Sequence, residues 1–233
     1  MRFPVFSLCL LLPLFVAFAP HLRAEPAPTV AADPFAKWEK EIAAFEAKDR
    51  ENPPPKGGIV FVGSSSIKKW VTLAEDFPHH QVLNRGFGGS QIIDSVHFAD
   101  RIVIPYEPRM VVFYAGGNDI HAHKTPEQVF ADFQAFVEKV RAKLPKTEIA
   151  CISIAGNPAR WAEVEQVKAL NTMLESYIKG KEDMKFINVF PRMLGSDGLP
   201  RTEIFVADRL HMNPEGYKLW TEIVGQYLPA ADR

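Results

Sequence analysis

The chain has 233 residues, of which 47% are hydrophobic, and a formal net charge of -1. This length predicts one domain, or at most two, and is sufficient for one substantial core. The near-neutral charge and the lack of a Lys/Arg cluster argue against a nucleic-acid-binding protein, which would present a basic face.

The first 24 residues predict a secretory signal peptide. They carry Arg2, then an apolar run from about Phe3 to Ala19, and no acidic residue. Cleavage is expected after Ala24, because a cut after Ala19 would leave a proline first. The alternative is an uncleaved membrane anchor. It is disfavoured by three prolines and by an apolar run shorter than the roughly 20 residues that a spanning helix needs.

Cleavage would give a secreted or periplasmic protein without a stable membrane span. It would remove two positive charges, Arg2 and Arg23, so the net charge would change from -1 to -3. It would also remove Cys9 and leave Cys151 as the single cysteine, which excludes an internal disulfide. Cys151 lies in an apolar run and is expected to be a buried strand residue.

The mature chain is expected to comprise a flexible tether at 25–32 and one domain at 33–233. Asp33-Pro34 predicts the N-cap and first residue of a helix that ends near Arg50. Strand-length apolar runs and helical patterns then alternate. The apolar runs are Ile59–Val62, Gln81–Asn84, Met110–Tyr114, Glu148–Ile154 and Phe186–Phe190, and the helical patterns lie near 66–76, 90–103, 125–143, 159–179 and 213–228.

This alternation predicts a parallel sheet with helices on both faces. In such sheets, ligand sites gather at the carboxyl ends of the strands. Three of the predicted strands end in small, polar, glycine-rich segments, namely "GSSS", "NRGFGGS" and "YAGGND". We therefore expect a functional site where these three segments meet.

A serine in "GSSS" could act as a nucleophile if the chain supplies a base and an acid that orients it. In "ADRLHMNPEGY", Asp208 and His211 are three residues apart, a spacing that places two side chains side by side on a helical turn. The backbone of Gly88-Gly89 and the amide of Asn118 could donate hydrogen bonds to an oxyanion. Each of these signals is weak alone, since an isolated D-x-x-H or "GFGG" usually has no catalytic role.

Two patterns point to other chemistry. "GSSSI" lacks the second glycine of the nucleophile elbow of α/β-hydrolases. "NDIHAH" supplies Asp119, His121 and His123, which resemble a set of metal ligands. Two glycines precede it and Thr125-Pro126 follows, so a loop is expected here rather than a metal-binding strand. We predict no metal and no cofactor.

Taken in order, "FVGSSSI", "NRGFGGS", "YAGGND" and "DRLHMNPEGY" resemble the four sequence blocks of the SGNH hydrolase, or GDSL-type esterase, superfamily. The resemblance covers about Gly58 to about Tyr227. The first family block reads Gly-Asp-Ser, whereas this chain has Gly63-Ser64-Ser65, so the hydrogen bonding around the nucleophile is expected to differ. Ser66 is expected to cap the helix that follows.

The resemblance implies a role for each matching residue. Ser65 would be the nucleophile, Asp208 the acid and His211 the base. The oxyanion hole would be formed by Ser65, Gly89 and Asn118. The implied fold is a three-layer α/β/α sandwich with a parallel sheet of about five strands, flavodoxin-like in plan.

The implied function is ester hydrolysis through a covalent acyl-enzyme. We expect short acyl esters, such as O-acetyl groups on carbohydrate. The segment 190–210, the longest candidate for a roof, is mixed in character and carries Arg192, Asp197, Arg201 and Glu203, so it is poorly suited to a lipase-sized apolar patch. A generalist esterase, a lipase or lysophospholipase, and a non-catalytic carbohydrate-binding module on the same fold are the alternatives.

Overall fold

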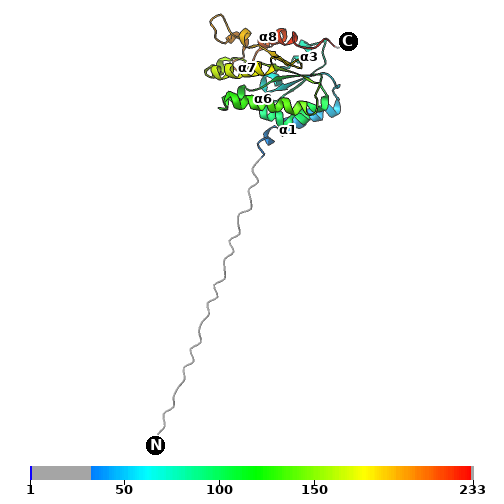
Figure 1. Cartoon of the computed structure of the whole chain (residues 1–233), viewed down its shortest axis with the longest axis vertical. Helices are drawn as coiled ribbons and strands as arrows, with labels where there is room; N and C mark the ends of the chain where they lie inside the picture. The colour runs from blue at the N-terminus through cyan, green and yellow to red at the C-terminus, as the bar shows by residue number, and fades with distance from the viewer. Residues whose placement is uncertain (2–32, 232–233) are drawn as a thin grey trace. The chain divides into compact units, whose positions relative to one another are not determined.

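A sheet of five parallel strands lies at the centre of the computed structural model (Figure 1). Its strands follow the order β2-β1-β3-β4-β5. Their bounds are β1 Ile59–Gly63, β2 Val82–Gly86, β3 Met110–Tyr114, β4 Glu148–Ile152 and β5 Met184–Ile187. The structure describes Met1 and residues 33–231, so the predicted signal peptide beyond Met1 and the predicted tether lie outside the described residues.

The strand order places three carboxyl ends side by side. Gly63, the last residue of β1, pairs with Gly86 of β2 on one side and with Tyr114 of β3 on the other. After β2 the chain crosses to the other side of β1, so the direction of strand addition reverses between β1 and β3. In open parallel sheets this reversal leaves a crevice at the carboxyl edge. The predicted meeting of the three glycine-rich segments is confirmed.

Helices cover both faces of the sheet, as the alternating pattern predicted. One face packs against α1 Ala36–Glu51, α4 Ile92–Ile102, α6 Pro126–Arg141 and α7 Val164–Ile178, and the other against α2 Ser65–Lys68, α3 Leu73–Asp76 and α8 Pro214–Gly225. Figure 1 shows α3 and α8 on the side opposite to α1 and α6. Successive strand residues alternate between the faces: Val60 and Val62 point to the first, and Ile59 and Phe61 to the second.

The connecting segments contain further short helices. These are η1 Ile104–Tyr106, α5 Gly117–His121, η2 Pro158–Glu163, η3 Phe190–Met193 and η4 Thr202–Ile204. The helix predicted near 159–179 therefore begins as the 3₁₀ segment η2 and becomes α-helical only at Val164. The first helix starts at Ala36 after Phe35 rather than at Pro34, so Asp33 is not its N-cap.

The helix predicted near 66–76 is split into α2 and α3, because Trp70 is buried between them. The Trp70 ring packs against Phe61, Phe77 and Trp220, and its Nε1 donates a 2.6 Å hydrogen bond to Asp76. Burial of a large side chain thus outweighs local helix propensity here.

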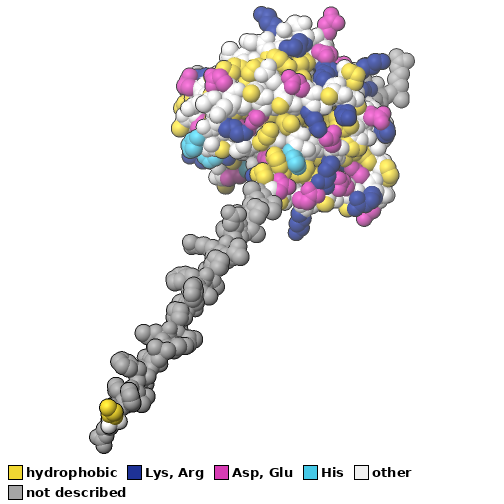
Figure 2. Space-filling view, turned by 60° about the horizontal axis from the view of Figure 1, so that its bottom comes forward, with side chains coloured by type: hydrophobic (Ala, Val, Ile, Leu, Met, Phe, Trp, Pro, Cys, Tyr) yellow, Lys and Arg dark blue, Asp and Glu magenta, His cyan; other side chains and the backbone are white. Residues whose placement is uncertain are grey.

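The single cysteine of the described residues is buried, and the charges on the displayed surface are mixed, as expected from the sequence. Cys151 is buried in β4, and burial raises the pKa of its thiol, so it is a packing residue. Basic and acidic side chains are interspersed over the face displayed in Figure 2. None of the helices in the described residues is long and apolar enough to cross a membrane.

Candidate active site

A sharp turn at the end of β1 positions the serines. Gly63 has φ of +147°, and a Cβ built on it would lie 1.9 Å from the carbonyl oxygen of Tyr114. Only glycine allows this close approach. The chain then turns directly into α2, whose first residue is Ser65.

The three serines occupy different environments. Ser64 is buried, and its carbonyl accepts from the N–H groups of Ile67 and Lys68, so Ser64 is the N-cap of α2. The expectation that Ser66 caps the helix was wrong, because α2 begins one residue before it. The Ser66 carbonyl instead accepts a 2.9 Å hydrogen bond from Tyr217 Oη. Ser65 is the serine that contacts a histidine.

Ser65, His211 and Asp208 form a continuous chain of hydrogen bonds. Ser65 Oγ lies 2.8 Å from His211 Nε2, and His211 Nδ1 lies 2.6 Å from Asp208 Oδ2. Asp208 Oδ1 also accepts from the N–H groups of Leu210 and His211, at 2.9 Å each. The hydrogen bond from the His211 side chain is the main reason that the pKa of Asp208 lies well below its usual range. Asp208 is therefore a carboxylate at neutral pH.

The loop that carries Asp208 and His211 is not helical, although their spacing is compatible with a helical turn. It lies between η4 and α8 and is closed by hydrogen bonds from Val206 N–H to His211 O and from Arg209 N–H to Val206 O. Arg209 has φ of +59°, so the chain bends back on itself at this residue. The tight loop, rather than helical periodicity, places the two side chains together.

The second glycine-rich segment follows β2, the strand beside β1, and it contains a backbone N–H group that is available to a ligand. Gly89 has φ of +78° and is exposed, and among the described residues its N–H has no acceptor. Ser90 Oγ donates to Phe87 O at 2.9 Å, which fixes the turn before α4. Asn118, in α5, donates from Nδ2 to Ser90 O at 2.9 Å. The second and third segments are thus joined directly.

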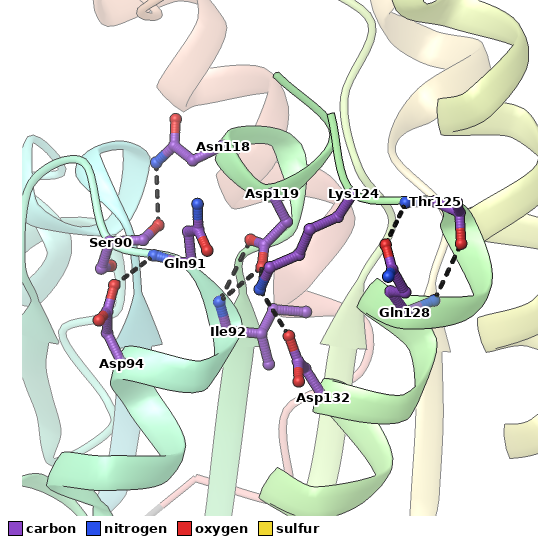
Figure 3. Close-up of polar contacts among 10 residues, drawn as sticks. All are labelled: Ser90, Gln91, Ile92, Asp94, Asn118, Asp119, Lys124, Thr125, Gln128 and Asp132. Carbon is purple, nitrogen blue, oxygen red and sulfur yellow. Dashed lines mark hydrogen bonds and ion pairs between the residues drawn. The ribbon is translucent and has the colours of Figure 1, made fainter. Parts of the chain in front are cut away.

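A buried carboxylate reinforces this junction (Figure 3). Asp119 is fully buried and accepts from the N–H of Ile92, the first residue of α4, at 3.2 and 3.3 Å. Lys124 Nζ bridges Asp119 and Asp132 at 3.0 and 2.7 Å. Burial raises the pKa of Asp119, and the hydrogen bond from Lys124 opposes that shift. Asp119 therefore fastens α5, with Asn118, to the N-terminus of α4.

We expect Asp119→Ala to lower the free energy of unfolding by about 3 kcal/mol, because it removes one partner of a buried ion pair and leaves the Ile92 N–H without its acceptor. The matched control is Asp100→Ala. Asp100 pairs with Lys139 at the surface, where ion pairs contribute less than about 1 kcal/mol. Urea unfolding followed by circular dichroism measures both. Equal losses in the two variants would contradict this role for Asp119.

Within "NDIHAH", Asp119 and His121 form polar contacts with different residues. Asp119 faces Lys124 in the interior, whereas His121 Nδ1 lies 2.6 Å from Glu163 at the surface. The segment expected to be a loop includes part of α5. In the part of the chain that the structure describes, no group of three or more His, Cys, Asp or Glu side chains could hold a metal ion.

A small pocket of about 40 Å³ opens beside Ser65 and His211. Asn118 lines it, as do three residues that the sequence did not single out: Tyr114, Asn157 and Arg160. Tyr114 ends β3, so its position at the carboxyl edge was a usable signal. Asn157 directly precedes η2 and Arg160 lies within it, and neither residue belongs to a recognisable sequence motif.

A model of the GDSL-like lipase/acylhydrolase family matches residues 63–219. The chain belongs to this family. The match begins at Gly63 and includes Ser65, Gly89, Asn118, Asp208 and His211. The resemblance to the SGNH hydrolase, or GDSL-type esterase, superfamily is therefore confirmed. No curated protein matches the chain in sequence.

Solved structures share the fold of this GDSL-like chain at low sequence identity. A Streptococcus pneumoniae protein named for platelet activating factor has a TM-score of 0.73 at 20% identity, over 83% of this chain and 94% of that one. A GDSL-like lipase from Bacteroides thetaiotaomicron has 0.69 at 21%, over 80% and 96%. An acetyl-xylooligosaccharide esterase from Geobacillus has 0.61 at 11%, over 77% and 99%. This chain thus shares the three-layer α/β/α sandwich fold of these proteins.

Proposed function

We propose that this GDSL-family protein is a serine esterase that hydrolyses short acyl esters through a covalent acyl-enzyme. The observation that carries the proposal is the hydrogen-bonded chain from Ser65 through His211 to Asp208. A nucleophile, a base and an acid that orients the base are the three parts such a reaction needs. Membership of an acylhydrolase family supports the same reaction class.

In the first half of the proposed reaction, Ser65 Oγ attacks the carbonyl carbon of the ester while its proton moves to His211 Nε2. The carbonyl oxygen becomes an oxyanion, for which the N–H groups of Ser65 and Gly89 and the amide of Asn118 are the proposed donors. The intermediate collapses with cleavage of the bond to the alcohol oxygen. His211 returns the proton to that oxygen, so the alcohol leaves neutral and the acyl group stays on Ser65.

In the second half, water attacks the acyl carbon and gives a proton to His211 Nε2. Collapse of the second intermediate breaks the bond to Ser65 Oγ, which takes that proton back, and the carboxylic acid is released. Asp208 accepts a hydrogen bond from the Nδ1–H group of His211 throughout. It therefore selects the tautomer with a free Nε2 and stabilises the imidazolium. No step requires a metal or a cofactor.

The size of the pocket supports a short acyl group. On the scale by which one water needs roughly 10–15 Å³, about 40 Å³ is space for a few water molecules, which suits a small acyl group better than a long chain. Polar side chains at the pocket, including Asn157 and Arg160, suit a polar alcohol such as a sugar. We therefore propose O-acetyl groups on carbohydrate as the substrate, in a secreted or periplasmic setting after removal of residues 1–24.

One surface feature favours the alternative of a lipase or lysophospholipase. A groove of about 530 Å³ runs between the α2–α3 connection and α8, and its lining includes Val71, Val206, Met212 and Tyr217. Val71 is 86% exposed, so an apolar side chain at the groove is accessible to a ligand. Met212 lines both this groove and the small pocket. In a lipase, this groove would be the site for a long acyl chain, and Met212 would lie between that chain and the small pocket.

A series of p-nitrophenyl esters separates the two substrates. We expect kcat/KM to be highest at two to four carbons and at least tenfold lower at eight, since each misfitted methylene costs about 1 kcal/mol. Release of acetate from acetylated xylan then tests the carbohydrate alcohol. A matched variant, Val71→Asp, places a charge in the groove and should leave short-ester activity unchanged. A maximum at eight carbons or more, lost in Val71→Asp, would establish the lipase alternative instead.

A further inference from the structure

Arg160 is a cation in the wall of the candidate catalytic pocket. It lies in η2, where its backbone N–H donates to Asn157 Oδ1 at 3.0 Å. The neighbouring Ala159 N–H donates to Arg209 O at 3.0 Å, in the loop that holds Asp208 and His211. The backbone around Arg160 is therefore hydrogen-bonded to the Asn157 side chain and to the loop that carries Asp208 and His211.

The Arg160 side chain reaches Asn118. Its Nη1 donates to Asn118 Oδ1 at 2.9 Å and to Gly117 O at 3.2 Å. Among the described residues, no carboxylate forms an ion pair with Arg160; Glu163, which also lines the pocket, pairs with His121. The guanidinium therefore places its positive charge beside the Asn118 amide and in the pocket lining.

These contacts determine which end of the Asn118 amide faces which neighbour. The oxygen and nitrogen of an amide side chain are nearly the same size, so their placement depends on the hydrogen bonds they make. Figure 3 shows the nitrogen of Asn118 directed at Ser90 and the oxygen on the opposite side. Ser90 O can only accept and Arg160 can only donate. A flipped amide would set two acceptors against each other on one side and two donors on the other.

We propose that Arg160 is a positioning residue that fixes the Asn118 amide with its nitrogen available to the oxyanion. Asn118 Nδ2 carries two hydrogens, and Ser90 O takes one of them. The other remains for a ligand. Donation from the guanidinium to Oδ1 also polarises the amide, which makes Nδ2 a stronger donor to negative charge. This role rests on the proposed esterase function.

The test is a double-mutant cycle between Arg160 and Asn118, measured with p-nitrophenyl acetate. Arg160→Met should lower kcat and kcat/KM by similar factors, on the order of 10- to 100-fold, because the lost interaction belongs to the transition state. Asn118→Ala should cost more, on the order of 10²–10³-fold. In the Asn118→Ala background, Arg160→Met should have little further effect, because its target is gone.

Two further variants complete the experiment. Arg160→Lys retains a cationic donor and should recover part of the loss. Arg192→Met removes an exposed arginine outside the pocket, 3.8 Å from Glu222, and should match the wild type. Thermal unfolding confirms that each variant is folded.

The possible results separate this proposal from the proposed function. Losses that multiply in the double variant would mean that Arg160 acts independently of Asn118, and Arg160→Met activity within threefold of the wild type would mean that it does not act at all. Either result overturns the positioning role and leaves the esterase function intact. A wild type that hydrolyses no ester would overturn both.

Discussion

Ser65→Ala should reduce kcat/KM for a short-chain ester by a factor on the order of 10⁴–10⁶, because removal of a nucleophile leaves only binding and oxyanion stabilisation. Ser65 Oγ is the hydroxyl that lies 2.8 Å from His211 Nε2. The measurement is steady-state hydrolysis of p-nitrophenyl acetate by purified protein, with circular dichroism to show that the variant is folded.

The neighbouring serines provide matched controls for this loss. Ser64→Ala and Ser66→Ala should retain most of the activity, because Ser65 is the one of the three serines whose hydroxyl contacts His211. Each control removes the same single oxygen atom within one residue of Ser65. A large loss in either control together with a small loss in Ser65→Ala would show that the nucleophile has been misassigned.

Asp208→Asn should lower kcat by about 10⁴-fold while the fold remains intact, because an amide at this position favours the wrong tautomer of the catalytic histidine. The pKa of Asp208 is held below its usual range by the hydrogen bond from His211. The carboxylate is therefore charged across the neutral range, and the substitution removes that charge at every pH used for the assay. The loss should accordingly be seen from about pH 6 to pH 9.

Asp197 makes a backbone hydrogen bond equivalent to one of Asp208 and therefore provides a control for Asp208→Asn. Asp197 Oδ1 accepts from the N–H of Leu199 at 2.9 Å, just as Asp208 Oδ1 accepts from the N–H of Leu210 at 2.9 Å. Asp208 additionally contacts the ring of His211. Asp197→Asn should therefore leave kcat unchanged. Similar losses in Asp197→Asn and Asp208→Asn would indicate a general effect on loop structure rather than on the histidine.

The parts of the fold that follow a repeating pattern were predictable from the sequence. The apolar runs predicted all five strands, and Met110–Tyr114 matches β3 to the residue. The last run was misplaced by two to three residues: β5 is Met184–Ile187 rather than Phe186–Phe190. Its last two predicted residues, Val189 and Phe190, are apolar because they pack outside the sheet. Burial therefore did not distinguish strand from connection here.

The candidate site was predictable where residues stand in short motifs. Ser65 and Asn118 each stand two residues after a glycine with positive φ, and Asp208 and His211 are close in sequence. The contacts of Arg160 join positions 42 residues apart, and no local pattern encodes them. The fastening of α5 to α4 by Asp119 likewise spans 27 residues. Such contacts exist only once the sheet has brought its carboxyl ends together.

Labelling with a fluorophosphonate tests the central claim most directly, because this reagent bonds only to an activated serine and does not depend on knowledge of the substrate. The protein is labelled, digested and analysed by mass spectrometry, with Ser65→Ala and His211→Ala treated in parallel. The account predicts one adduct on Ser65, none in Ser65→Ala and much slower labelling in His211→Ala. An adduct on Ser64, on Ser66 or on a serine outside the pocket, or no adduct at all, would contradict it.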